Sequence, residues 1–500
     1  MNDQGISASI PLLGHYKSRL PLGSDDKNFL PDKQEHSLHC EDQAWRPSLS
    51  QVVAEIKELC TIAFPMIITG LLIYGKSAIS MLFMGRLGKE VLAGGSLSIG
   101  IANITGYSII SGLALGMEAI SSQACGAKQW PLMGQTLQQT ITILILACIP
   151  ISLLWLNFEP IWSSNLSSTL SKFTSEPRNI TRPLMLSAAF SLSLHFPISY
   201  ILAHRFSLGI RGIAVAVAIT DLNLLAALLL YLYFSGICRK SWQGWSLQCF
   251  DEWRPILSLA IPSCISVCLE WWWYELMIVL SGILSNAPEA VAAMGILIQA
   301  TSLVYIFPSA LSLAVSTRVG NELGANQPNK AKMSSIIALS CAVLMSIIAM
   351  LFMTLMRHAW GQIFTTDKAI LSLIATAMPV VGLCELGNCP QTTGCGVLRG
   401  SARPTLGANI NLGSFYGVGL PIAMLMGIAM GLGLLGFWLG LLVAQAVCAI
   451  VMVVVLTRTD WKVQANRARE LTGIDSEDEA ESKTLDGSIS IILVDELIIT

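Results

Sequence analysis

Charge is scarce in this sequence. Lys, Arg, Asp and Glu make up 12% of its 500 residues, whereas ordinary soluble domains contain about 25%. The charges also gather at the two ends: residues 1–50 hold 12 and residues 459–500 hold 14, which leaves 36 of the 62 for the 408 residues between them. With a mean hydropathy of +0.63, this composition excludes a soluble globular protein and suits a lipid bilayer.

Several other features are missing. The net charge of −2 comes without a concentrated basic face, which excludes nucleic-acid binding. The 13 cysteines include no CxxC pair and no Cys/His spacing suited to zinc, so we expect no disulfide framework, metal site or cofactor. No HExxH or DDxxD-like string is present, which argues against an intramembrane enzyme. The first 50 residues lack the apolar core of a cleavable signal peptide, so insertion must rely on an internal span.

Apolar stretches long enough to cross the bilayer as helices are present in abundance. Eleven are predicted, at about 58–84, 91–117, 135–157, 183–204, 208–234, 255–284, 290–315, 333–357, 369–396, 404–430 and 433–457. The fold class is therefore an all-α polytopic membrane protein, with a disordered N-terminal tail over 1–50 and an acidic C-terminal tail over 459–500. Basic residues in alternate connections place the C-terminal tail in the cytosol, and an odd number of spans would put the N-terminal tail on the other side.

The two halves of the sequence resemble each other. Glu90 and Glu289 open similar strings 199 residues apart, and Gly126 and Gly324 close similar strings 198 residues apart. The next marker, Arg-Pro at Pro183 and at Pro404, has an offset of 221, so the first half is short by 23 residues. That is about one membrane-spanning helix. We expect a twelve-span parent from which the fourth span is missing; a truncated or spliced variant and a gene-model error both fit.

Three strings together resemble one family. They are Cys268-Leu-Glu-Trp-Trp-Trp-Tyr-Glu275, Ser316-Thr-Arg-Val-Gly-Asn-Glu-Leu-Gly-Ala325 and Gly112-Leu-Ala-Leu-Gly-Met-Glu-Ala-Ile-Ser-Ser-Gln-Ala-Cys-Gly-Ala127. Over roughly residues 50–458 the chain is similar to the multidrug and toxic compound extrusion (MATE) transporters, in particular their plant branch. The resemblance implies an N-lobe (51–240) and a C-lobe (241–458) around a central cleft, and export of organic solutes in exchange for protons.

Ionisable groups inside the spans are the first candidates for function, because each costs at least about 2.5 kcal/mol in hydrocarbon. Glu270 and Glu275 share one span, and five residues of helix place them about 140° apart, on different faces. A carboxyl at Glu270 could take up and release protons. The resemblance also implies coupling or substrate roles for both glutamates; the alternative is a carboxyl that locks two helices together.

Neighbouring polar and aromatic residues add further candidates. Glu385, Asn388 and Gln391 recur at helical spacing and predict a polar stripe facing the bundle interior. Plant relatives often carry Asp at the position of Asn388, so a second proton carboxylate is absent or replaced by Glu385. Tyr274, Gln391 and Trp273 are candidate substrate contacts, although packing explains most membrane aromatics.

We interpret the remaining charged residues within the spans as structural. Glu118 should pair with an Arg or Lys at the cytosolic rim, and Lys76 with Asp221 would neutralise both charges. His195 is either a proton relay or a hydrogen-bonded packing residue.

Two functions remain open. The first is a monomeric antiporter that exchanges protons for a small organic cation or amphipathic metabolite, in the plasma membrane or an endomembrane (vacuole, Golgi or late endosome). The second is a non-transporting shortened isoform, or a regulatory membrane partner of a full-length homologue.

Overall fold

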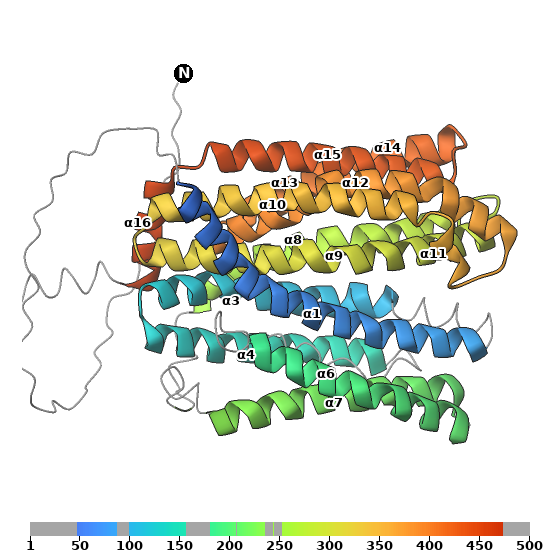
Figure 1. Cartoon of the computed structure of the whole chain (residues 1–500), viewed down its shortest axis with the longest axis horizontal. Coiled ribbons are helices and arrows are strands. Elements are labelled where there is room, and N and C mark those ends of the chain that lie inside the picture. The colour runs from blue at the N-terminus through green and yellow to red at the C-terminus, as the bar shows by residue number, and fades with distance from the viewer. Residues whose placement is uncertain are drawn as a thin grey trace, which may run out of the picture.

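The structure is a computed structural model that describes residues 48–87, 100–156, 181–206, 208–235, 244 and 253–473. These residues form a bundle of long, roughly parallel helices (Figure 1). The helices before residue 240 (the N-half) are α1 Leu49–Leu87, η1 Asn103–Tyr107, α3 Ser108–Gly126, α4 Trp130–Leu156, α6 Thr181–Tyr200, η3 Ile201–Arg205 and α7 Gly209–Ser235. Those after it (the C-half) are α8 Trp253–Ser281, α9 Ala287–Gly324, α10 Pro328–Leu355, α11 Ala359–Gln362, α12 Lys368–Gly400, α13 Pro404–Asn411, η6 Leu412–Gly419, α14 Leu420–Met424, η7 Leu425–Ala429, α15 Leu434–Thr457 and α16 Trp461–Thr472.

The predicted number of spans is confirmed in the described part of the chain. Eleven helical segments are long and apolar enough to cross a membrane, five in the N-half and six in the C-half. The second span differs from its expected place at 91–117, because the helix continues through Glu118 to Gly126. The carboxylate of Glu118 is tolerated within the helix because Arg399 neutralises it.

Both ends of the described bundle lie on the same side, contrary to the expectation from an odd span count. Near the start of α1, Glu55 bonds to Arg318 at the end of α9, and α15 also ends on that side (Figure 1). The reason is that α6 runs parallel to α4. Early in α6, Leu184 packs near Met66 of α1, and later His195 bonds to Ser80, so α6 follows the direction of α1.

Helix α4 begins at the end where α3 finishes and runs toward the far end, and α6 runs in the same direction. The predicted loss of the fourth span falls between α4 and α6, at 157–180, outside the described residues.

In the C-half, the fourth spanning helix is α12, which corresponds to the span predicted to be missing from the first half. Helix α12 packs extensively on α9, α10 and α15 and so holds that half together. In the N-half, α3 and α4 pack on each other and on α8, while α6 and α7 pack on each other and on α1. No described helix of the first group packs extensively on α6 or α7. Within the described residues, the helices of the N-half thus form two groups without a central helix like α12 of the C-half.

Helix α16 lies within the segment assigned from sequence to the C-terminal tail. Its start is capped by Asp460, and its buried residues Trp461, Ala465 and Ala468 line one face. This face packs on α9 and α10 of the C-half and on α3 of the N-half, so the helix bridges both halves at the end where the bundle's termini lie.

We expect Trp461→Ala to destabilise the protein by about 3 kcal/mol, the usual order for truncating a buried tryptophan. Trp461 is 8% exposed and its ring fills the contact of α16 with the bundle. The measurement is the melting temperature of the purified protein. Val463→Ala, on the exposed face of the same helix, is the matched control and should leave the melting temperature unchanged.

Candidate functional site

Glu270 on α8 begins a buried hydrogen-bond network. Its Oε2 accepts from Nε2 of Gln391 on α12 at 3.4 Å, and the same nitrogen lies 3.3 Å from Oδ1 of Asn411 on α13. Asn411 in turn donates to Oγ of Ser266, one turn before Glu270, at 3.1 Å. Tyr305 of α9 lies beside the carboxylate as well. Glu270 is therefore buried among neutral hydrogen-bonding partners.

A second carboxyl belongs to the same network. Glu385 is 1% exposed and accepts from Nδ2 of Asn388 at 2.8 Å, and Gln445 of α15 donates to Oδ1 of Asn388 at 3.4 Å. The hydroxyl of Thr392 lies 3.5 Å from Asn388 and 3.4 Å from Gln391, which joins this group to the group around Glu270. The polar stripe expected on this helix thus faces the interior of the C-half and connects two carboxyl groups.

Glu275 points elsewhere, as its helical position predicts. Its Oε1 accepts from Nδ2 of Asn103 in η1 at 3.1 Å, and Oε2 lies against Gly100, where a Cβ atom would approach it to 2.6 Å. The side chain is half-buried and faces the N-half across the contact between α8 and η1. The structure does not bring Glu270 and Glu275 together.

The aromatic candidates are packed side chains in this conformation. Trp273 is fully buried, with its ring centroid 5.8 Å from that of Phe415 and 6.1 Å from that of Tyr416. Tyr274 is partly buried and packs against the main apolar core. Access of a solute to either ring would require the helices to move.

The N-half contains a separate polar cluster. Lys76 Nζ donates to Oδ1 of Asp221 at 2.5 Å, which is the pairing expected from the sequence. His195 is fully buried between Thr220 Oγ1, at 2.8 Å from Nδ1, and Ser80 Oγ, at 3.1 Å from Nε2. Among the described contacts, this cluster shares no hydrogen bond with the network in the C-half.

The two halves meet tightly at one end of the bundle. Arg399 Nε donates to Oε2 of Glu118 at 3.1 Å, which supplies the basic partner expected for Glu118. Gly126 and Gly324 make reciprocal close contacts, since a Cβ on either would lie 2.0 Å from a backbone oxygen of the other helix. This closed end is rich in Arg and Lys, so the positive-inside rule predicts that it faces the cytosol, and we call it the cytosolic end below.

Sequence reasoning missed part of the site. Asn411, Gln445, Tyr305 and Ser266 are neutral, and the sequence indicated neutral residues only where they lie close to Glu270 or Glu385 on the same span. The signal was available for Asn411 and Gln445, because a carboxamide within an apolar span also needs a hydrogen-bonding partner. The pairing of Arg399 with Glu118 follows only from the packing of α12 against α3.

Comparison with known proteins assigns the family. The model of the MatE family matches residues 65–195 and 262–425. Protein DETOXIFICATION 48 of Arabidopsis thaliana is 52% identical, over 94% of this chain and 93% of its own length, and Protein DETOXIFICATION 49 of the same plant is 49% identical, over 87% and 91%. The crystal structure of the eukaryotic MATE transporter AtDTX14 superposes with a TM-score of 0.76 at 29% identity, covering 84% of this chain and 99% of AtDTX14.

The alignment with one relative is longer than the part of this chain that it covers. The alignment with Protein DETOXIFICATION 49 runs over 459 residues, whereas the 87% of this chain that it covers is about 435 residues. The relative therefore has about 24 residues in the aligned region that this chain lacks, close to the length of one spanning helix.

From the matched family model, the identity along the chain and the shared fold, we conclude that this multi-pass membrane protein belongs to the MATE family, whose members are transporters and not enzymes.

Proposed function

We propose that the protein is a proton-coupled antiporter that exports a small organic cation or amphipathic metabolite. The observation that carries the proposal is the buried network in which neutral side chains link Glu270 to Glu385. No cation bonds directly to either carboxylate among the described contacts, so each can exist with or without a proton. A membrane potential contributes about 2.3 kcal/mol per charge per 100 mV to proton entry.

Alternating access is proposed to use the two lobes, 51–240 and 241–458. The structure has its cytosolic end closed by the Glu118–Arg399 pair and the glycine contacts. Protonation of Glu270 from outside favours one state of the cleft and release of the solute, and loss of the proton on the cytosolic side resets the carrier. Glu275, which faces the N-half, is proposed to assist in coupling or solute binding.

The test is solute exchange in proteoliposomes under an imposed pH step, with ethidium as the organic cation. Exchange should depend on the size and sign of the pH step and vanish when a protonophore collapses it. Exchange that continues unchanged without a pH gradient would contradict proton coupling.

A second candidate function has its own support. Among the described helices of the N-half, α3 and α4 form one group and α6 and α7 another, and no described helix joins the two groups as α12 joins the helices of the C-half. The N-half is therefore less suited to move as one body. These observations favour a shortened form that does not transport by itself but acts as a partner of a full-length homologue.

Restoring one span distinguishes the two functions. We expect that inserting an apolar, helix-forming segment of about 23 residues, the length missing from the repeat, between α4 and α6 raises pH-driven ethidium exchange at least about tenfold. That increase corresponds to about 1.4 kcal/mol in the barrier. A Gly/Ser insert of the same length is the control and should not raise it. If the chain without an insert already exchanges ethidium as fast as the restored chain, the second candidate fails.

A further inference from the structure

Arg399 pairs with the carboxylate of Glu118 and lies within electrostatic range of the carboxylate of Glu270. Its Nε donates to Glu118 in the N-half, while its Nη2 donates to Ser312 Oγ in the C-half at 2.9 Å. The field of Arg399 also acts on Glu270, which belongs to the same half as Arg399. One guanidinium thus takes part in the contact between the halves and in the environment of the proposed proton carrier.

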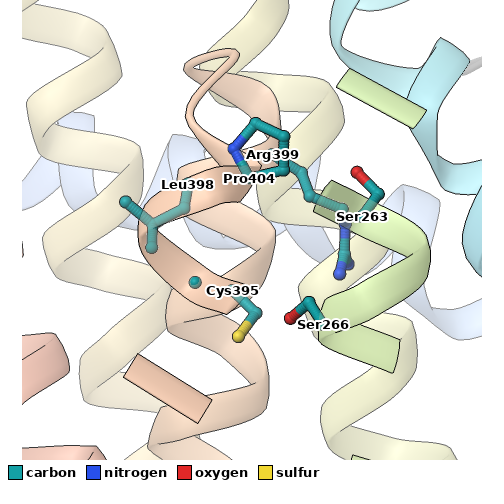
Figure 2. A pocket seen from close by; sticks show the side chains of 7 residues that line it. Ser263, Ser266, Cys395, Leu398, Arg399 and Pro404 are labelled. Atoms are coloured by element: carbon teal, nitrogen blue, oxygen red, sulfur yellow. The ribbon is translucent and has the colours of Figure 1, made fainter. Parts of the chain in front are cut away.

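A polar seam between α8 and α12 connects the two groups. Ser266 lies one turn before Glu270 on α8, and Cys395 lies one turn before Arg399 on α12, so each pair shares a helix face. Between them is a cavity of about 10 Å³, whose polar lining consists of Ser263, Ser266, Cys395 and Arg399 (Figure 2). That volume admits a single water molecule, and the lining offers it several hydrogen-bonding partners.

We propose that Arg399 couples the charge on Glu270 to the closure between the halves, an inference that rests on the proposed function. When Glu270 is neutral, Glu118 holds the guanidinium and the cytosolic end stays closed. When Glu270 is ionised, its charge draws the guanidinium toward the cavity and Ser266, and the pair with Glu118 weakens. The cytosolic end then opens more readily, because this pair joins α3 to α12 across the contact between the halves.

Other titratable groups also lie around Glu270. They are Glu385 and Cys395 on α12, Tyr305 on α9, Tyr274 on α8 and Cys448 on α15. Of these, only Glu385 is a second carboxyl. It lies 14 residues before Arg399, about 21 Å along the helix, compared with about 12 Å for Gln391, which contacts Glu270. Glu385 therefore adds a constant background that the substitutions below do not change.

The test follows the opening of the cytosolic end directly. Ser122 of α3 is buried against Gly320 of α9, so a Ser122→Cys chain reports opening through its rate of reaction with a water-soluble maleimide, read on that peptide by mass spectrometry. The reporter chain must keep the wild-type melting temperature. Glu270→Gln, a neutral mimic, is expected to slow labelling by about fivefold or more, the usual size of coupling between sites.

The decisive comparison repeats Glu270→Gln in other backgrounds. With Arg399→Gln the response to Glu270→Gln should disappear, whereas Arg399→Lys, which keeps the cation, should retain it. Arg403→Gln is the matched control. Burial and the nearby Arg467 lower the pKa of Arg403 only to about 10, so Arg403 is charged and this substitution removes a cation at the same end of the bundle. Arg403 bonds to Thr459 and not to Glu118. This background should keep the full response.

The inference is overturned if Glu270→Gln slows labelling equally with and without Arg399, or does not slow it at all. Either result leaves the proposed function standing if pH-driven exchange is still lost in Glu270→Gln. Conversely, exchange that survives Glu270→Gln contradicts the proposed function, whatever the labelling rate shows.

Discussion

Replacing Glu270 by glutamine is expected to reduce pH-driven exchange to the level of empty proteoliposomes, a loss of at least about tenfold. Glutamine has nearly the same shape and can keep the contact with Gln391 through its own carboxamide, but it cannot bind and release a proton. Since Glu270 is 7% exposed and bonded to neutral partners, the substitution removes its charge without opening a cavity. The measurement is initial ethidium flux at several pH steps.

The control for this result is Glu289→Gln, which removes a carboxylate from the first turn of α9, away from the network. It should leave flux and its pH dependence unchanged. Membrane insertion and melting temperature should match the wild type in both variants. A Glu270→Gln protein with normal flux and normal pH dependence would exclude Glu270 as the proton carrier. If the wild-type chain shows no flux, the same comparison applies to the chain with the restored span.

Replacing Gly126 or Gly324 by alanine is expected to lower the exchange rate at least about tenfold. This corresponds to an increase of at least about 1.4 kcal/mol in the barrier of the transport cycle. In each case the new Cβ would lie 2.0 Å from a backbone oxygen across the contact, on Asn321 or Gln123, so the helices must separate. Neither glycine has a positive φ, so alanine fits the backbone of each helix, and the expected loss comes from the contact between α3 and α9.

Gly295→Ala is the matched control for these variants. It lies on α9, the helix that carries Gly324, and a Cβ there meets no other atom within 4 Å. Its exchange rate should equal that of the wild type. Unchanged exchange in both Gly126→Ala and Gly324→Ala would show that close approach of α3 and α9 is not needed in the transport cycle.

The sequence alone was sufficient for the parts that depend on one segment at a time. Each apolar run had to become a helix, because lipid offers no partner to backbone N–H and C=O groups. The different faces of Glu270 and Glu275 followed from helix geometry, and the inward direction of Glu385 and Asn388 followed from the cost of polar groups in hydrocarbon. The ends of the helices were less predictable, since a charge such as Glu118 ends a span only when it lacks a partner.

Contacts between distant segments were beyond such reasoning. The pairing of Glu118 with Arg399 joins residues 281 positions apart, and the link from Glu270 to Asn411 passes through Gln391 on a third helix segment. The parallel course of α4 and α6 was also missed, because counting spans assumes that every connection between neighbours turns back at the membrane surface.

By itself, therefore, the sequence determined that this is a helical membrane protein with eleven apolar spans, two similar halves and a few ionisable groups within the spans. Each of these groups is costly in lipid unless it has a partner. Only the tertiary structure decided which partner each of those groups has, that one end of the bundle is closed by Arg399 and the glycine contacts, and that the described helices of the N-half form two groups without a helix between them. The physical reason is that the hydrophobic requirement acts along each segment separately, whereas ion pairs, close backbone contacts and helix direction depend on segments that meet only after folding.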